Sequence, residues 1–363
     1  MVLPSFDRGG SESYCLRLIN FSKERKIDWH VTSGNLRNAQ LHPEFVKAGA
    51  KVYQESAGRI DIRQGLAFKR FLQQQRFDVV MTLTGLFGAE ALKLARAAKV
   101  PCRIAWHRRS TPAFSPSFSR KLYTRWSLWE LERSSDWILS NSETALDRFH
   151  GSRWRDQTRF RVIPNGVDPE RFQLQPSIRK EVRDAHGLPE SALVVGHIGR
   201  FDPAKDHETL LRTVRTARDC GQNAWLLCAG TGTDTMQFRD RVTAQGIADY
   251  TRCLGARAEV DRLYQAMDVF LFPSVTEGQP NALIEAMLSG VRILASDIPP
   301  IREAMPEFLH GHLFSPGDAE EATRLLIENV DSGPDKIARA REWAIDRYDP
   351  KRNFNAVLEI MGC

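Results

Sequence analysis

Residues 277–285 read EGQPNALIE and lie between two apolar runs, 268–274 (DVFLFPS) and 291–297 (VRILASD). Each run is short and hydrophobic through its middle, which is typical of a strand buried in a parallel sheet. Between the runs a helix is expected, with Pro280 in its first turn and Gly290 as its C-terminal stop. This stretch is therefore predicted to be a strand–loop–helix–strand unit, and such units build parallel α/β sheets.

Two carboxylates lie on the ligand side of this unit. In open parallel sheets, ligands bind beyond the carboxyl ends of the strands. Glu277 is in the loop at that edge, and Glu285 is in the second turn of the helix that follows. The helix N-terminus between them offers free N–H groups and a partial positive charge, which favour an anion. This combination suits a nucleotide sugar, because its hydroxyls need acceptors and its diphosphate needs donors.

These residues match a known pattern. Glu-x7-Glu, with EGQPN at 277–281 and LIEA at 283–286, resembles the large GT4 family of retaining glycosyltransferases (glycosyl transferases group 1). That family includes sucrose synthase-like and lipopolysaccharide-building enzymes. Glu-x7-Glu alone would indicate only an acidic loop and a surface helix, and the preceding strand and the embedded Gly-x-Pro-Asn favour the family. The resemblance covers nearly the whole chain and implies the α/β GT-B fold, which has two Rossmann-like doubly wound domains.

The length and composition fit that fold class. A chain of 363 residues is too long for one typical core, so two domains are expected. Its hydrophobic fraction of 42% and charged fraction of 26% are those of a soluble globular protein. We see no apolar run near the ~20 residues that span a bilayer and no secretory signal. The 6 cysteines form no Cys-x-x-Cys pair, which suits a reducing cytoplasm. A cytoplasmic location is expected, with a peripheral place on the inner face of the plasma membrane as an option.

The charge is distributed unevenly. Residues 1–165 carry 28 Lys+Arg and 15 Asp+Glu, a net +13, and residues 166–363 carry 23 and 30, a net −7, which sum to the +6 of the whole chain. A basic half favours an anionic partner. No recognised nucleic-acid-binding motif is present, so nucleic acid is not expected as a partner. An anionic membrane surface or a phosphorylated acceptor fits better.

The first loop of the chain carries paired glycines. Residues 2–4 predict the stub of a first strand, shorter than in members of the resembled family, either because the start is late or because the strand is cut short. Gly9 and Gly10 follow, and two glycines between strand and helix let a backbone approach a ligand closely. Gly-Gly alone is a plain turn. Gly-Gly-x-Glu resembles the family's first loop, which lies against the donor phosphates and the acceptor.

Strands and helices alternate through the first half, which predicts a doubly wound domain. Residues 77–82 and 100–107 are expected strands, with a helix through 89–98 between them. His107 ends the second strand. A strand-end histidine here resembles the family's active-site histidine, which contacts the donor sugar. The alternative is a structural or surface histidine.

A basic, tryptophan-rich segment follows a loop expected at 110–120. Two interpretations of this segment stay open. Residues 120–137 carry four basic and four aromatic side chains: Arg120, Lys121, Arg125, Arg133, Tyr123, Trp126, Trp129 and Trp137. A basic amphipathic helix with tryptophans can lie on a membrane. It can equally bury its tryptophans in the domain core.

The domain boundary is expected at a Pro-Asn-Gly turn. Residues 160–168 read FRVIPNGVD, which resembles the linker of this family. We therefore expect an N-terminal acceptor-side domain over 1–165 and a C-terminal nucleotide-sugar domain over 166–347. Residues 348–363 are expected to be a helix that crosses back onto the first domain.

The second domain is expected to begin with a strand over 193–200 and a loop over 201–206. Arg200 and Lys205 can converge on a diphosphate from this loop, since Arg offers a bidentate fork and Lys a point charge. The alternative is a solvated basic turn. The family has the same spacing but usually a glycine after the Lys, where this chain has Asp206, which puts the loop geometry in doubt. By resemblance, backbone groups near Leu254 pair with a uracil-type base.

The resemblance implies a retaining glycosyltransferase that uses a nucleotide sugar, with a UDP-sugar as the expected donor. Glu285 would accept hydrogen bonds from the ribose, Glu277 would hold hydroxyls of the transferred sugar, and Arg200 and Lys205 would stabilise the departing diphosphate. Backbone N–H groups near Gly10 and Asn281 would add to this. The remaining expected donor-loop residues are Gly278, Pro280 and Ala282. No Asp-x-Asp metal signature occurs, so no metal or other cofactor is expected.

The expected acceptor is lipid-linked or a polysaccharide, in the synthesis of cell-surface glycans. Two other readings stay open. A nucleotide-sugar epimerase can share the fold, but it would show catalytic acids in both domains in place of Glu-x7-Glu. A non-catalytic partner subunit would be expected to lose Glu277, Arg200 or Lys205, and all three are present.

Overall fold

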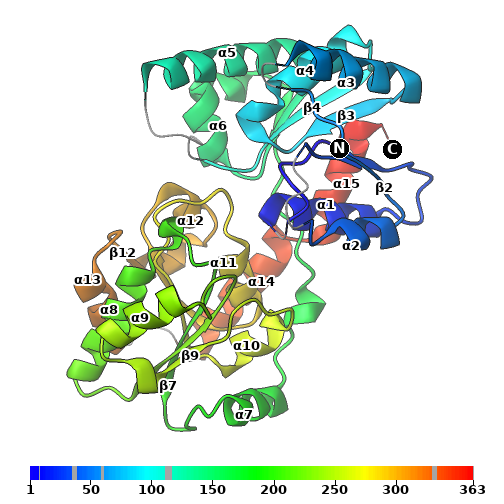
Figure 1. Ribbon diagram of the computed structural model, residues 1–363. Coiled ribbons are helices and arrows are strands. Elements are labelled where there is room, and N and C mark those ends of the chain that lie inside the picture. The colour runs from blue at the N-terminus through cyan, green and yellow to red at the C-terminus, as the bar shows by residue number, and fades with distance from the viewer. Residues whose placement is uncertain (8, 35–38, 59–60, 111–116, 329–332, 363) are drawn as a thin grey trace. The chain divides into compact units, whose positions relative to one another are not determined.

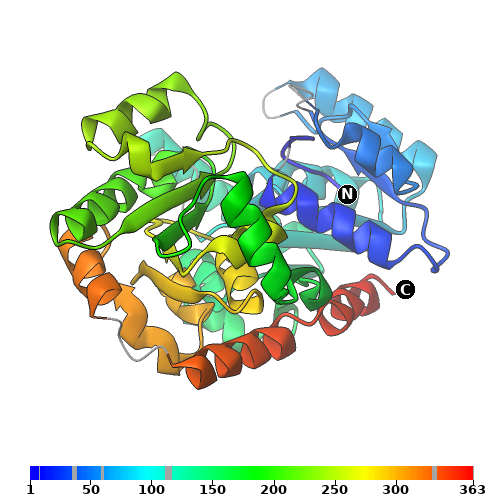
Figure 2. The same cartoon turned by 90° about the horizontal axis from the view of Figure 1, so that it is seen from below.

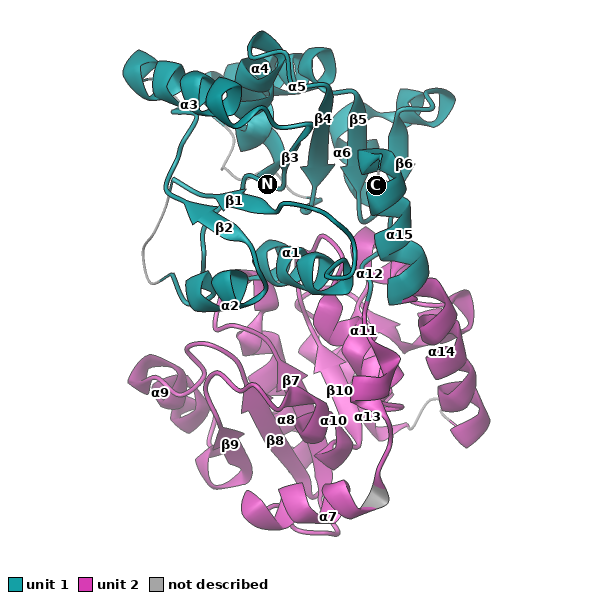
Figure 3. Ribbon diagram, turned by 90° about the vertical axis from the view of Figure 1, so that its right-hand side faces the viewer, with its two compact units in different colours: residues 1–166, 350–363 teal, residues 167–349 magenta. Residues whose placement is uncertain are grey.

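The computed structural model describes residues 1–363 except 8, 35–38, 59–60, 111–116, 329–332 and 363. The chain forms two compact units (Figure 3). The first unit comprises Met1–Gly166 and Pro350–Cys363, and the second unit comprises Val167–Asp349. The unit boundaries therefore fall after residues 166 and 349, against the expected 165 and 347. Helix α15 (Pro350–Met361) belongs to the first unit although it follows the second in sequence.

The second unit is built on a six-stranded parallel sheet in the order β12-β11-β10-β7-β8-β9. The sheet residues alternate between two cores. In β10, Phe270 and Phe272 face one hydrophobic cluster, and Val269 and Leu271 face the other. Both faces are buried, which explains the unbroken apolar run. The strands are β7 (Leu193–Ile198), β8 (Ala224–Ala229), β9 (Thr251–Cys253), β10 (Val269–Phe272), β11 (Arg292–Ser296) and β12 (Leu313–Phe314).

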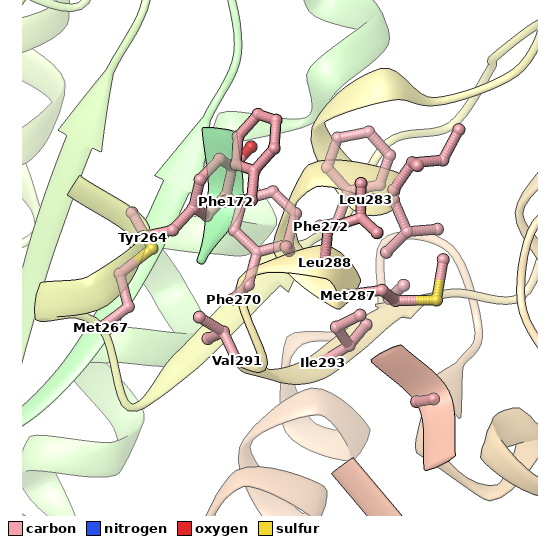
Figure 4. Packing of buried hydrophobic residues seen from close by; sticks show 14 of the residues in the cluster. Phe172, Tyr264, Met267, Phe270, Phe272, Leu283, Met287, Leu288, Val291 and Ile293 are labelled. Atoms are coloured by element: carbon pink, nitrogen blue, oxygen red, sulfur yellow. The ribbon is translucent and has the colours of Figure 1, made fainter. Parts of the chain in front are cut away.

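Helices cover both faces of this sheet. On one face α11 packs against α14, and Figure 4 shows Leu283 and Met287 of α11 lying over Phe270 and Phe272. On the other face α8 packs against α13 (Figures 1 and 2). The helices are α7 (Pro176–Ala185), α8 (His207–Asp219), α9 (Met236–Ala244), α10 (Val260–Ala266), α11 (Asn281–Leu288), α12 (Pro299–Glu303), α13 (Ala319–Ile327) and α14 (Pro334–Arg347).

The first unit has two parallel sheets, β1-β2 and β3-β4-β5-β6, joined by the chain start. Val2 forms parallel bridges to Thr32 and to Thr82, and its N–H donates to the Met81 carbonyl at 2.8 Å. The expected first strand is thus a single bridging residue. The named strands are β1 (His30–Thr32), β2 (Lys51–Tyr53), β3 (Val79–Thr82), β4 (Cys102–His107), β5 (Trp137–Ser140) and β6 (Phe160–Val162).

Two helical layers enclose the β3-β4-β5-β6 sheet (Figure 1). One core cluster joins the sheet to α1, α2 and α15 through residues such as Tyr14, Phe45 and Val357. The other joins it to α3, α4, α5 and α6 through residues such as Leu92 and Leu131. The helices not yet bounded are α1 (Gly10–Phe21), α2 (His42–Lys47), α3 (Ile62–Gln75), α4 (Ala89–Ala97), α5 (Phe118–Ser134) and α6 (Glu143–His150).

Two sequence expectations need correction. Pro280 is the N-cap of α11 and not a residue of its first turn, since the helix begins at Asn281. The core interpretation of the tryptophans is wrong for Trp126 and Trp129, which are 37% and 53% exposed. Trp137, in β5, is half-buried. Over the residues that the structure describes, no helix has the length and apolarity needed to cross a membrane.

Candidate active site

The winding of the second sheet reverses at β7. Strand β7 lies between β8 and β10, so its two neighbours are reached by connections running in opposite directions. The crevice beyond such a switch point is where open α/β sheets bind ligands. The loops that leave β7 and β10 here, residues 199–206 and 273–280, are called the switch-point loops below. They are joined directly, because the N–H of Val275 donates to the carbonyl of Ala204 at 2.9 Å.

The switch-point loops bring Lys205 and Glu277 together. Lys205 ends the short 3-10 turn Pro203–Lys205, and its ammonium donates to Oε1 of Glu277 in an ion pair. The two side chains are only 19% and 11% exposed. The Lys205 Nζ also lies 4.9 Å from the centroid of the Phe272 ring. A cation and a carboxylate are therefore held side by side at the edge of the sheet, where water screens them weakly.

Asp206 keeps the backbone conformation that a glycine would give. Its φ of 45° and ψ of 57° are left-handed, a region that Asp tolerates better than most residues. As N-cap of α8, its carboxylate accepts hydrogen bonds from the N–H of Thr209 at 3.3 Å and from its hydroxyl at 2.6 Å. Although Asp206 stands where the family usually has glycine, the turn is kept, and it holds Lys205 just before α8.

Arg200 lies exposed at the exit of β7. Within the described residues its guanidinium has no ion-pair partner. The backbone beside it is tightly packed, since a Cβ on Gly230 would lie 2.0 Å from the carbonyl oxygen of Gly199. Gly230 also has a φ of 143°, which favours glycine. The structure therefore fixes the backbone at Arg200 and leaves its side chain accessible to a ligand.

The start of α11 carries the third part of the site. Its N-cap, Pro280, makes no side-chain capping bond, and Asn281 and Ala282 are half-buried there. Glu285, one turn further, accepts a hydrogen bond from the Tyr264 hydroxyl at 3.2 Å, and that hydroxyl lies 2.9 Å from the Ala282 carbonyl oxygen. Burial and the Glu285 charge raise the pKa of Tyr264 well above its usual value, so the hydroxyl stays protonated and remains a donor.

Tyr264 was not predicted from the sequence as a site residue. It lies on α10, is fully buried, and is 21 residues from Glu285, outside any local motif. Its hydroxyl fixes the carboxylate of Glu285 and the first turn of α11 together. Gly278, which the sequence also singled out, lies half-buried in the second switch-point loop.

Leu254 lies just beyond the edge strand β9, and its N–H is already bonded. It donates to the carbonyl of Cys228 at 2.9 Å, and the N–H of Gly255 donates to the Thr233 hydroxyl at 3.1 Å. The carbonyl of Gly255 accepts from the N–H of Gly230 at 2.7 Å. A nucleobase at this position would therefore use the carbonyl of Leu254 or groups further along the loop.

The paired glycines lie at the start of α1 in the first unit. Gly9 is the N-cap and Gly10 the first helical residue, with no side-chain cap. A Cβ on Gly10 would meet nothing within 4 Å, whereas one on Gly9 would lie 2.5 Å from Oε2 of Glu12. Glu12 is buried, and burial raises the pKa of its carboxyl. A side chain at Gly9 would thus displace only the end of the Glu12 side chain, and Gly10 is exposed.

His107 is buried at the end of β4, so the surface alternative is wrong. Its Nε2 lies 3.0 Å from Nε2 of His150, whose Nδ1 lies 2.6 Å from Oε1 of Glu132. Phe149 stacks on the His107 ring with centroids 4.9 Å apart. Burial lowers the pKa of His107 to about 3, so its ring is neutral. Neither His150 nor Glu132 was singled out from sequence, because they come from α6 and α5 and meet only in the fold.

The predicted site residues therefore fall into two groups. Those of the second unit gather at the carboxyl edge of one sheet, with Lys205 and Glu277 in contact and Glu285 tied to Tyr264. Gly9, Gly10 and His107 belong to the first unit. Among the described residues, no cluster of His, Cys, Asp or Glu side chains has the arrangement of a metal site.

Comparisons with known proteins cover most of the chain. Residues 178–345 match the family model described as Glycosyl transferases group 1. Residues 8–171 match the model described as Glycosyltransferase Family 4. Two curated relatives align over nearly the whole length. EpsF of Bacillus subtilis (strain 168), provisionally named a glycosyltransferase, is 27% identical over 99% of this chain and 94% of its own. The phosphatidyl-myo-inositol mannosyltransferase of Mycobacterium leprae (strain TN) is 25% identical over 96% and 92%.

A solved structure shares the architecture of the whole chain. HepE of Anabaena in complex with UDP superposes with a TM-score of 0.84, covering 99% of this chain and 98% of its own at 19% sequence identity. The same protein has also been solved with UDP-glucose. At this identity the likeness shows the fold, and the two parallel α/β units of the structure agree with it.

Proposed function

The chain belongs to the group 1, family 4 glycosyltransferases and has the GT-B fold, and we propose that its donor is a UDP-sugar and its acceptor lipid-linked or a polysaccharide. As a member of this family it is a transferase enzyme of glycan biosynthesis. The proposal concerns the donor, the acceptor, the roles of the site residues and retention of configuration at the transferred sugar.

One observation carries the proposal, which is the Lys205–Glu277 pair between the switch-point loops. A cation suits the diphosphate of a sugar nucleotide, and a carboxylate suits the hydroxyls of its sugar. The two groups are held next to each other, as the bond between the sugar and the diphosphate requires. UDP as the nucleotide is supported by HepE, whose structures are complexes with UDP and with UDP-glucose.

Lys205 and Arg200 would stabilise the charge that develops on the departing diphosphate. The bond between the sugar C1 and the β-phosphate oxygen breaks, and its electron pair stays on that oxygen. Fixed cations are most effective when they lie where such charge develops. The N–H groups at the start of α11, near Asn281, would add donors of the same kind. In this proposal the Arg/Lys pair takes the place of a divalent ion, and no metal or other cofactor takes part.

Glu285 would accept hydrogen bonds from the ribose hydroxyls, with Tyr264 fixing its carboxylate. Tyr264 is a positioning residue in this scheme, since it acts through Glu285. Gly278, Pro280 and Ala282 would form the backbone against which the sugar and diphosphate lie. The carbonyl of Leu254 would serve the base.

The acceptor hydroxyl would attack C1 on the face from which the diphosphate leaves, with its proton passing to the departing phosphate oxygen. This step retains configuration and needs no protein nucleophile. Gly9, Gly10 and His107 are proposed, from the family resemblance, to contact the donor phosphates and the sugar. A lipid-linked acceptor is supported by the mycobacterial relative, whose name specifies phosphatidyl-myo-inositol as the group it modifies.

A donor screen tests the proposal. Purified protein is incubated with UDP-, GDP- and ADP-sugars, and release of the free nucleotide is measured without acceptor and with simple acceptors. The proposal expects turnover with at least one UDP-sugar and a product anomer that matches the donor by NMR. Turnover with GDP- or ADP-sugars alone would contradict the nucleotide assignment, and an inverted anomer would contradict retention.

A further inference from the structure

Helix α5 has its polar and apolar faces reversed. A helix on a protein surface normally buries its apolar residues and exposes its polar ones. In α5 the most buried side chains include Ser127, Glu130 and Ser134, at 0%, 3% and 0% exposure. The Ser134 hydroxyl donates to Oε1 of Glu130 at 2.5 Å, so these two groups satisfy each other. The Ser127 hydroxyl has no hydrogen-bond partner within the described residues. Leu131 is the one fully buried large apolar residue among the described residues of this helix.

The large apolar side chains of α5 lie on its outer side. Phe118, Leu122, Trp126 and Trp129 are 80%, 52%, 37% and 53% exposed. Their spacing of four, four and three residues places them along one stripe of the helix, opposite the buried serines. Among the described residues of the first unit, no packing accounts for four large exposed residues on one stripe. We call this stripe and its flanking cations the α5 outer face.

Cations flank the stripe. Lys121, Arg125 and Arg133 are exposed and share its side of the helix, whereas Arg120 is exposed at the helix start on the other side. The guanidinium of Arg133 lies 5.1 Å from the Trp129 ring centroid, and Lys93 of α4 lies 5.9 Å from that of Trp126. These cations lie against the aromatic rings, so the stripe is both apolar and positively charged.

Acidic groups near the face are already engaged. Glu130 points inward and is buried. Glu132 is paired with His150, and Glu90 of α4 accepts from Lys93 at 3.2 Å. Helix α4, which packs along α5, also adds Arg96, whose guanidinium donates to the Arg133 carbonyl at 3.2 Å. The α5 outer face is therefore positively charged overall.

We infer that the α5 outer face docks on the surface of an anionic lipid bilayer. A basic helix with exposed Trp, Phe and Leu lies in the interface plane, with its apolar side chains among the headgroups and its cations near lipid phosphates. Charge decides between occupants, because two copies of the same basic face repel each other whereas an anionic bilayer attracts it.

Docking would place the enzyme where a lipid-linked acceptor is found. The choice of a lipid-linked acceptor rests on the proposed function, whereas binding of the bilayer itself does not. The experiment is therefore run on membrane binding and on donor turnover separately, so that either can fail without the other.

Co-sedimentation with vesicles tests the inference. Wild-type protein is mixed with vesicles of phosphatidylcholine alone or with added phosphatidylglycerol, at low and high salt. Binding should require phosphatidylglycerol and weaken with salt, as expected for a charge-driven contact. Replacing Lys121→Gln and Arg125→Gln together should weaken binding at low salt about 30-fold, since each cation contributes about fivefold near an anionic surface. Trp126→Ala with Trp129→Ala should remove the part of binding that persists at high salt.

Matched controls come from the second unit. Met236→Ala removes an exposed apolar side chain of α9, and Arg212→Gln removes an exposed cation of α8, so both should bind vesicles as wild type does. All variants should melt near the wild-type temperature and hydrolyse the donor at the wild-type rate, because α5 is outside the proposed donor site. Failure of wild type to bind anionic vesicles at low salt would overturn the inference. Equal binding by the α5 variants, or a concentration-dependent dimer abolished by Trp126→Ala with Trp129→Ala, would also overturn it.

Discussion

Lys205 and Glu277 are 72 residues apart in sequence and form one shielded ion pair between two loops of the same sheet. The pair exists because parallel strands β7 and β10 are neighbours, so the loops at their carboxyl ends leave the sheet together. A donor diphosphate would compete with Glu277 for the Lys205 ammonium. The pair therefore keeps the cation positioned before the donor arrives.

Replacing Lys205 or Arg200 should reduce turnover far more than stability. Removal of one donor that stabilises developing charge typically costs roughly 10²–10³ in rate. Lys205→Ala should be the more severe change, because it also removes the cation that faces the shielded carboxylate of Glu277, and that carboxylate then repels the diphosphate. Steady-state rates are measured beside thermal melting, with Arg212→Ala as a control cation on α8. Rates within a few-fold of wild type in both variants would refute the diphosphate role.

Activity should persist in EDTA. The prediction rests on the missing Asp-x-Asp signature in the sequence and on the two cations placed by the first switch-point loop. Initial rates are compared after chelation, after dialysis, and after Mn²⁺ or Mg²⁺ is added back. If EDTA abolished activity and either ion restored it, the metal-free mechanism would be wrong.

Asp206 should tolerate glycine better than alanine. Its left-handed backbone would cost an alanine roughly 1–2 kcal/mol, and loss of the α8 cap to alanine costs about 0.5–2 kcal/mol more. Asp206→Gly keeps the backbone free and should lose only a few tenths of a kcal/mol, and Asp206→Asn should be nearly neutral. Urea unfolding measures the free energy of unfolding of the three variants and so gives their order of stability. Equal destabilisation by Gly and Ala would show that the φ of 45° is not what constrains this position.

Stability should fall as the pH drops below about 6.5. Burial lowers the pKa of His107 to about 3 and that of His207 to about 4, while an unfolded histidine titrates near 6.5. Between these values the unfolded state binds more protons than the folded state, so stability is complete above the unfolded pKa and decreases as the pH falls toward the folded one. The expected slope is on the order of 1.4 kcal/mol per pH unit for each such group.

The variant His207→Phe isolates one of these contributions. His207 is buried among the rings of His197, Phe201 and Phe238, and neither of its ring nitrogens has a hydrogen-bond partner within the described residues. Carboxylates with lowered pKa, such as Asp147, also lose stability in acid, so wild type alone is ambiguous. Unfolding of both proteins at pH 7 and pH 5 should show a smaller loss in the variant. An identical loss would contradict the role of His207.

Much of the donor side could be predicted from the sequence because its signals are local. The apolar run at 268–274, the helix start near Pro280 and the stop at Gly290 set β10 and α11, and Gly290 does adopt a φ of 63°. Strand order in the sheet then determines that Lys205 and Glu277 meet. Their pairing follows from the fold, although no short motif connects them.

The parts that sequence did not predict depend on which side of an element packs inward. Tyr264 reads as one more apolar residue of α10, and only tertiary packing brings its hydroxyl to Glu285. His150 and Glu132 reach His107 in the same way. The burial of the α5 tryptophans could not be predicted because it depends on which side of the helix packs against the rest of the unit. That inward side is formed by Ser127, Glu130 and Ser134.

The most direct test of the account is calorimetric titration of Glu285→Ala and Glu277→Ala with UDP and with the UDP-sugar found in the screen. The central claim is that the donor lies along the switch-point loops and the start of α11, with the ribose at Glu285 and the sugar at Glu277. Glu285→Ala should weaken UDP itself. Glu277→Ala should spare UDP and weaken only the intact UDP-sugar. Equal UDP affinities in the two variants, or loss of UDP binding in Glu277→Ala alone, would contradict the claim.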